Sequence, residues 1–420
     1  MISTRIQRHK LLFPGWVVSL GVLVIAGLIA GIIVLVRGLI VTNLSDLVPW
    51  GLWITLDLSA IALSAGAFTL SAAVYLLGLK ELQPVARTAV FIGLIGYSMA
   101  MMMLFMDIGR PDRLWHALVY WNIHSPLWEV TMCICLYFSV LILEVIPIFG
   151  DADFMKGRWP RLSLRMTKVH YLAPFLAIAG LCLSMLHQSS LGATYGILKA
   201  RPIWYQPGMA VLFIVSAAIA GPALVVLASR IASKITPKAK VKEELLDQVA
   251  KYIGFALLAY LYLRFWDAFS MSYTYEPARS EGLNMLTQGS LSFNFWVGEI
   301  ILGIIVPSVI LLSSRLRSHK NLQMLAMLLV VGGLVAFRWD INLVGQLVVY
   351  GVLPQDMLPR YTQYTPSLIE ILVAIGVISY GVLAFTLGVR YLKVVDHQSE
   401  TGHESHKKES AVIPASVSTD

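Results

Sequence analysis

Charged residues are scarce in this chain of 420 residues: Asp, Glu, Lys and Arg make up 13% of it, and hydrophobic residues make up 57%. Soluble domains typically contain about 25% charged residues, so the composition excludes an ordinary soluble protein. The apolar runs are about 20 residues long and do not alternate with polar residues, which favours membrane-spanning helices over a barrel. We therefore expect an all-α membrane protein.

Cysteine and histidine are also few, with three and nine residues. Cys133 and Cys135 lie in one apolar run. On a helix, residues two apart point in different directions, so the two thiols cannot bind one metal, which argues against an iron–sulfur or zinc site. A haem b needs histidines at mid-depth on facing helices, whereas His170 and His187 lie near opposite ends of one run. We expect no haem, no iron–sulfur cluster and no metal site in this chain.

The apolar runs predict ten spans, of which the ninth is the shortest. They cover roughly residues 15–36, 50–79, 88–106, 126–149, 169–188, 209–229, 251–274, 292–313, 321–337 and 367–391. We expect two four-helix bundles, formed by spans 2–5 and 6–9, with flanking helices. The corresponding segments are an N-terminal anchor helix (1–49), a first bundle (50–192), a second bundle (193–340), an outer loop with the last span (341–395) and a disordered tail (396–420).

The basic residues predict the orientation of these spans. If the N-terminus is cytoplasmic, cytoplasmic segments hold 23 of the 32 Lys and Arg residues, and the outer loops, with Arg338 assigned to one of them, hold 8. This asymmetry predicts a multi-pass membrane protein with both termini in the cytoplasm. The net charge of +8 mostly reflects this basic collar and is poor support for nucleic-acid binding.

Two stretches of the chain resemble each other. Span 4 opens with Ser125 and reaches Glu129, and span 8 opens with Ser292 and reaches Glu299. The spans before them carry Asp107 and Asp267 near their outer ends. The pattern fits either a parallel repeat of two bundles or a chance similarity of apolar segments.

Polar residues gather at the outer ends of spans 2 to 5. Trp50, Trp53 and Asp57 share one helix face because they are spaced i, i+3 and i+7. Asp107 and Arg110 are spaced i, i+3 and can pair. The same side of the membrane also receives Glu129, His187 and Gln188. Ionisable groups within spans are costly and are functional candidates by default, although an interfacial aromatic belt and a structural Asp–Arg pair explain part of the set.

Other charged residues lie elsewhere in the spans. Glu144 is the main acid toward the inner side of span 4. Arg264 and Asp267 share a face of span 7, and Glu299 lies at similar depth in span 8. We expect these three to form a buried ion pair or triad, with a proton relay as the alternative.

At these residues the chain resembles the polysulfide reductase NrfD-type family of membrane subunits, and most closely its HybB-like branch, the quinone-linked subunit of hydrogenase-2. The resemblance is carried by PWGLWITLD (49–57), GYSMAMMMLFMDIGR (96–110), SPLWE (125–129), HQSSLG (187–192), LRFWD (263–267) and FWVGE (295–299). It implies a subunit of the bacterial inner membrane with no bound redox cofactor, and a quinone site near the periplasmic face of the first bundle. It also implies a periplasmic four-cluster-type iron–sulfur subunit as partner, with a further catalytic or cytochrome subunit.

Carried onto this chain, the resemblance predicts a pocket built by Asp57, Asp107, Glu129 and His187, with Trp50 and Trp53 as its walls. We expect His187 to hydrogen-bond a menaquinone or ubiquinone carbonyl with Gln188 nearby, Asp57 to pass a proton, and Arg110 to shape the site. Glu144 can then supply protons from the cytoplasm. Two other functions fit the same residues: a secondary transporter built from two repeats, and an anchor that only tethers a soluble enzyme.

Overall fold

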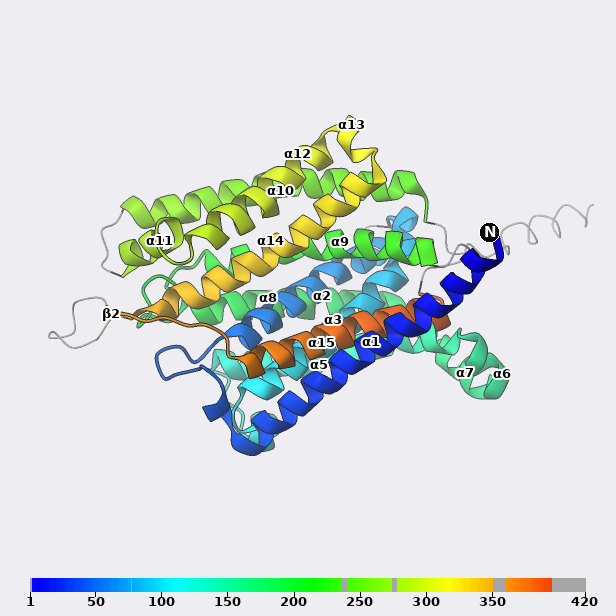
Figure 1. Ribbon diagram of the computed structural model, residues 1–420, viewed down its shortest axis with the longest axis horizontal. Coiled ribbons are helices and arrows are strands. Elements are labelled where there is room, and N and C mark those ends of the chain that lie inside the picture. Colours follow the sequence, from blue (N-terminus) through cyan, green and yellow to red (C-terminus); the bar gives the residue numbers. More distant parts are fainter. Residues whose placement is uncertain (1, 77, 236–240, 274–277, 350–359, 395–420) are drawn as a thin grey trace, which may run out of the picture.

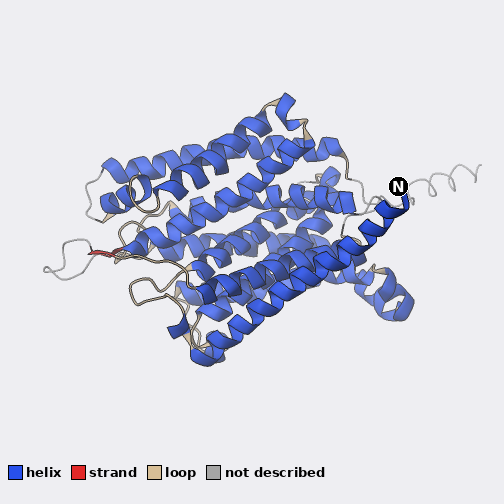
Figure 2. Cartoon of the chain, viewed as in Figure 1, coloured by secondary structure: helices blue, strands red, loops and turns tan. Residues whose placement is uncertain are grey.

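The computed structural model describes residues 2–76, 78–235, 241–273, 278–349 and 360–394, so the tail predicted to be disordered lies outside the described residues. The described chain is almost entirely helical (Figure 2), which confirms the all-α prediction, and its two short strands, β1 (Val348–Val349) and β2 (Arg360–Tyr361), form one antiparallel pair. The long helices are α1 (Ile2–Arg37), α2 (Leu52–Leu76), α3 (Gln83–Asp107), α5 (Pro126–Gly150), α8 (Ala173–Gly196), α9 (Met209–Ile235), α10 (Glu243–Tyr273), α14 (Lys320–Leu347) and α15 (Leu368–Tyr391).

Shorter helices connect these elements. A π-helix, η5 (Asn294–Ile305), continues directly into α12 (Val306–Leu312). The 3-10 turns are η1 (Leu39–Val41), η2 (Lys80–Leu82), η3 (Pro111–Arg113) and η4 (Val169–Leu172). The remaining short α-helices are α4 (His116–Val119), α6 (Asp153–Arg158), α7 (Pro160–Lys168), α11 (Arg279–Thr287) and α13 (Ser314–Arg317).

Within the described residues, nine helices are long and apolar enough to cross a membrane. They correspond to nine of the ten predicted spans, and the chain is therefore a multi-pass membrane protein. The predicted seventh span is α10, a helix of 31 residues. It falls outside the nine because charged residues, including Arg264 and Asp267, interrupt its apolar sequence.

By their packing contacts the long helices form two adjoining rings, and Figure 1 shows α9, α10, α12 and α14 above α2, α3, α5 and α8. In the first ring α2 packs against α3, α3 against α5, α5 against α8, and α8 against α2. The second ring is closed in the same way by α9, α10, η5 with α12, and α14. Helix α9 also packs on α2 and α8, and so joins the rings, while α1 and α15 pair with each other outside the first ring.

A glycine contact lets the two rings approach closely. A Cβ atom on Gly66 of α2 would lie 1.8 Å from the carbonyl oxygen of Ala217 in α9, and one on Gly221 of α9 would lie 2.1 Å from the amide nitrogen of Ala67. Small residues at helix crossings are how membrane helices gain packing contacts. The helices can therefore meet backbone to backbone only because both positions are glycine.

The described chain ends lie at one end of the bundle, which we call the terminal end. The Trp16 indole donates to the Thr386 hydroxyl at 3.4 Å, and the Arg390 guanidinium lies 5.5 Å from the centre of the Phe13 ring. Helices α6 and α7 project from the same end (Figure 1). The opposite end, where α3 finishes and α2 and α5 begin, is called the loop end.

Two predicted helix ends are wrong. The fifth span continues to Gly196 instead of ending at 188, and the ninth continues to Leu347 instead of 337. Arg338, which the charge count placed in an outer loop, is fully buried inside α14. Both errors have one cause. The hydropathy falls at these positions because they carry polar side chains, but these side chains bond to neighbouring helices and the helix continues through them.

Candidate functional site

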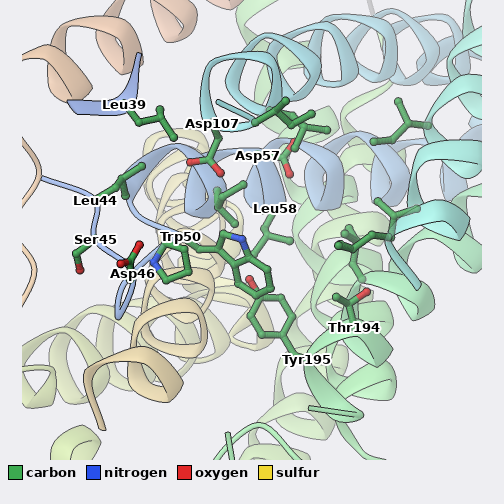
Figure 3. Close-up of a pocket in the computed structure, with 18 of the residues that line it drawn as sticks. Leu39, Leu44, Ser45, Asp46, Trp50, Asp57, Leu58, Asp107, Thr194 and Tyr195 are labelled. Atoms are coloured by element: carbon green, nitrogen blue, oxygen red, sulfur yellow. The ribbon is translucent and has the colours of Figure 1, made fainter. Parts of the chain in front are cut away.

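A cavity of about 610 Å³ opens at the loop end of the first ring (Figure 3). Its wall is formed by the segment around η1 and by the ends of α2, α3, α5 and α8 that meet there. Most lining side chains are apolar, such as Leu104 and Ile134. A mostly apolar pocket with a few converging polar groups is the usual form of a small-molecule site.

Three carboxylates line this cavity, of which Asp46 is exposed and two have a buried oxygen atom; Ser45, Thr194 and Tyr195 add hydroxyl groups. Asp57 lies two turns into α2, and Asp107 is the last residue of α3. In each, the Oδ1 atom is buried and has no hydrogen-bond partner among the described residues. The two groups are close enough to repel each other when both are ionised. Buried polar atoms are normally paired, so these two oxygens are available to a ligand.

Aromatic rings form the opposite wall, facing the two carboxylates (Figure 3). Trp50 stacks on Trp204 with 5.8 Å between ring centres and meets Tyr195 edge-on at 5.5 Å. The Tyr195 hydroxyl donates to the Asn342 side chain at 3.0 Å. The cavity therefore has aromatic rings on one side and Asp57 and Asp107 on the other.

The backbone that carries Trp50 is held by the second ring. The Asn342 amide donates to the carbonyls of Trp50 at 2.9 Å and Gly51 at 3.1 Å, and Gln346 both donates to the Trp50 carbonyl and accepts from its amide. Sequence reasoning missed Asn342 and Gln346. Their i, i+4 spacing at the end of an apolar run was the available signal, because it puts two amides on one helix face.

Tyr364, in the segment before α15, is hydrogen-bonded to the first residue of α2. Its hydroxyl accepts from the Leu52 amide at 2.9 Å and donates to Glu370. Burial, and then the hydrogen bond to Glu370, raise the pKa of Tyr364 above its usual range, so the phenol stays protonated. A Cβ atom on Gly51 would lie 2.2 Å from this hydroxyl oxygen. The glycine of the PWG motif is required by this contact.

His187 lies beneath the cavity and is absent from its wall. Because α8 continues to Gly196, His187 is nine residues, or about 13 Å, below the end of the helix. Leu191, one turn above on the same face, lines the cavity. His187 is completely buried, its Nδ1 is hydrogen-bonded to the Tyr97 hydroxyl, and its Nε2 has no partner among the described residues. The prediction that His187 forms part of the pocket wall is therefore wrong.

Gln188 and Trp53 also face away from the cavity. The Gln188 side chain accepts from Arg338 at 3.4 Å, across the boundary between the rings. The Trp53 indole donates to the Glu370 carbonyl at 3.0 Å and packs among residues of α1 and α15. The shared face predicted for Trp50, Trp53 and Asp57 is wrong: Trp50 lies before α2, which begins at Leu52, and Trp53 packs toward α1 and α15, away from the cavity that Asp57 lines.

Arg110 and Glu129 are the remaining predicted site residues at this end. Arg110 is exposed and pairs with Asp112 at 3.0 Å, so the predicted pair with Asp107 is wrong. The hydrogen bond from Arg110 lowers the pKa of Asp112. Glu129, in the first turn of α5, accepts from the Ser190 hydroxyl at 2.7 Å and ties α5 to α8.

Glu144 lies toward the terminal end of α5, as predicted. It lines a separate small cavity of about 70 Å³ with Ser71, Arg87 and His170. Its Oε1 atom is buried and has no hydrogen-bond partner among the described residues. Glu144 is thus placed between the first ring and the surface at the terminal end.

The expected triad in the second ring is confirmed. Arg264 donates to both carboxylate oxygens of Glu299, at 2.6 and 3.1 Å, and also to Asp267. Each of the three side chains is at most 5% exposed. A forked guanidinium that satisfies two carboxylates is the geometry in which a buried ion pair is best compensated.

Comparisons with known proteins agree with this architecture. The family model described as "Polysulphide reductase, NrfD" matches residues 40–350. The integral membrane subunit of menaquinone reductase from Nitratidesulfovibrio vulgaris is 32% identical over 89% of this chain and 90% of its own length. A subunit of selenate reductase from Mesobacillus selenatarsenatis is 27% identical over 94% of this chain and 97% of its own length.

A third relative bears on the predicted branch. The probable Ni/Fe-hydrogenase 2 b-type cytochrome subunit of Escherichia coli is 26% identical over 88% of this chain and 90% of its own length. The match to the family model covers most of the chain, including the cavity and both rings. The protein belongs to the polysulphide reductase NrfD family.

Proposed function

We propose that this chain is the quinone-reactive membrane subunit of a bacterial respiratory oxidoreductase complex. The observation that carries the proposal is the cavity at the loop end, where Asp57 and Asp107 present unpartnered carboxylate oxygens opposite the rings of Trp50 and Tyr195. A quinone head group is flat, apolar on its faces and polar only at two carbonyl oxygens. The cavity matches each of these properties.

The chemistry that this site would support is proton exchange. Reduction of a quinone to a quinol takes up two electrons and two protons, and the reverse reaction releases them. Protonated Asp57 and Asp107 can donate hydrogen bonds to the carbonyls and transfer protons as electrons arrive. The electrons come from a partner, a periplasmic four-cluster-type iron–sulfur subunit that is joined in turn to a catalytic or cytochrome subunit. The relatives named as subunits of larger reductases support such an assembly.

The same proposal fixes an orientation. The basic collar supports an orientation with the terminal end in the cytoplasm and the loop end at the periplasmic face of the inner membrane. Exposed residues beside the cavity, such as Arg110 and Asp112, then belong to the surface on which the partner docks. Glu144, toward the terminal end, would take protons from the cytoplasm.

We propose that His187 supports the site from beneath and does not contact the quinone. It lies one helical turn below the cavity floor and is bonded to Tyr97, so we assign it to the hydrogen-bonded layer beneath the site. Glu129, Gln188 and Trp53 position α5, α8 and α2 around the cavity. The Arg264–Asp267–Glu299 triad stabilises the second ring. We further propose that the chain holds no haem, since His170 and His187 lie 17 residues apart on one run of helix.

The test is quinone-linked turnover of the assembled complex in membranes. Asp57→Asn and Asp107→Asn keep the side-chain shape and remove the proton-transferring group, and we expect each to lower turnover about tenfold or more. Glu244→Gln, an exposed acid at the start of α10 that is outside this cavity, is the control and should retain turnover. Full turnover in both cavity variants, with the complex intact, would instead favour a plain anchor.

A further inference from the structure

A second cavity lies on the other side of α2. It has a volume of about 630 Å³ and is enclosed by α2, α3, α9 and α14 on one side and by α1 and α15 on the other. Asp57 and Leu58 face the loop-end cavity, whereas Ala60 and Leu63 face this one. One helix therefore separates two chambers of nearly equal size.

The wall of the second cavity offers no free hydrogen-bonding group among its described lining residues. Its three hydroxyls, on Ser59, Ser64 and Thr386, each donate to a backbone carbonyl, at 2.7, 2.6 and 2.7 Å. The other lining side chains are apolar apart from the Trp16 indole, which donates to Thr386. This wall differs from that of the loop-end cavity, where two acids are unpartnered. It favours a ligand whose buried part has no polar atoms.

The cavity is elongated along the helices and reaches the terminal end. Its lining runs along α15 from Ile378 to Thr386, about 12 Å at the rise of an α-helix, and ends at Phe13 and Trp16 of α1. An extended apolar chain fits this shape better than a compact ring system. Apolar cavities stay dry and bind apolar molecules. The side chains that line an empty cavity lack dispersion contacts, which a bound acyl chain would supply.

A free positive charge stands at the mouth. Arg390 is exposed, lies against Phe13, and has no ion pair with any described residue. Trp16 is 50% exposed beside it, and tryptophan is typical of the level of lipid head groups. A guanidinium is well suited to bind a phosphate. The charge is thus complementary to a phospholipid whose acyl chain enters the cavity.

We propose that the second cavity is a phospholipid site: it takes one acyl chain of a phospholipid from the adjacent leaflet, and Arg390 binds the anionic head group. The lipid fills the space between the α1–α15 pair and the two rings, and so stabilises the packing of these outer helices on the bundle. The occupant is a phospholipid and not a quinone, because none of the described lining groups is free to bond to quinone carbonyls.

Native mass spectrometry of the full chain in detergent tests this site. The delipidated protein is titrated with phosphatidylglycerol or with phosphatidylcholine of the same acyl chains. We expect one tightly retained lipid per chain, with phosphatidylglycerol retained at least threefold more strongly. Ala60→Leu with Ala228→Leu fills the cavity and should abolish retention of both lipids. Arg390→Ala should keep one bound lipid and lose the preference, whereas Arg315→Ala, an exposed arginine elsewhere, should change neither result.

Several outcomes would overturn the site. The first is retention that is equal in the wild type and the cavity-filled variant. The second is a lipid preference that survives Arg390→Ala, and the third is co-purified menaquinone in the cavity in place of phospholipid. If the filled variant does not fold, the selectivity change in Arg390→Ala still decides the question, because that exposed substitution leaves the core unchanged.

Discussion

The side-chain amide of Asn342 lies 2.9 Å from the carbonyl oxygen of Trp50. Asn342 belongs to the second ring, and Trp50 forms a wall of the cavity in the first. Buried carbonyls need a donor, and the residues before α2 obtain theirs from α14. The second ring therefore sets the shape of the loop-end cavity, although none of its described side chains lines that cavity.

Replacing Asn342 by leucine should disturb the cavity and the fold together. The carbonyls of Trp50 and Gly51 and the Tyr195 hydroxyl would lose a buried partner, at a cost of about 1–3 kcal/mol. We expect a lower unfolding temperature and a rise of about tenfold in the KM for quinol, because displacement of about 1 Å at a site is costly. Asn321→Leu, exposed on the same helix, should leave both unchanged. An unaltered KM in Asn342→Leu would contradict this role.

The hydrogen bond between Tyr97 and His187 should make these two residues act as a unit. We expect His187→Ala and Tyr97→Phe each to lower quinone-linked turnover about tenfold or more, and the double variant to lower it little further, because both single changes break the same link. Turnover in membranes, normalised to assembled complex, provides the measurement. Effects that multiply in the double variant would mean that the residues act independently.

Gly66→Ala should separate the two rings. The new methyl group would meet the backbone of α9, which cannot rotate away, and overpacking of this kind costs about 1–3 kcal/mol or more. Thermal unfolding in detergent should show a clear loss of stability. Gly157→Ala, where a Cβ meets nothing within 4 Å, should be as stable as the wild type. Equal stability of both variants would argue against a tight crossing of α2 and α9.

Variants of the triad residues distinguish a structural role of the triad from a role in proton transfer. Arg264→Met leaves two buried carboxylates without their cation and should destabilise the protein by about 3–5 kcal/mol. Glu299→Gln removes a titratable group but keeps a hydrogen-bond acceptor, so we expect turnover within about twofold of wild type in the assembled complex, with reduced stability. A collapse of turnover in a fully assembled Glu299→Gln complex would favour the proton relay.

The sequence was sufficient to predict the class of fold, the order of the spans and the triad, because these depend on apolar length and helical spacing. It also predicted that Asp57, Asp107 and Trp50 meet at one end. It failed where a polar segment is helical and buried: HQSS and the stretch RWDIN (338–342) lie within helices because their partners lie on helices distant in sequence. Such partners, Arg338 for Gln188 and Asn342 for Trp50, follow only from the packing of the two rings.

Photoaffinity labelling of the assembled complex is the decisive test of quinone binding in the loop-end cavity. A photoreactive menaquinone analogue is cross-linked in membranes, and the labelled peptides are mapped by mass spectrometry. The account predicts labels within residues 50–58, 104–108 or 191–195, which excess menaquinone suppresses. Labels that resist competition, or that fall around Glu144 and His170 or in the second cavity, would contradict it.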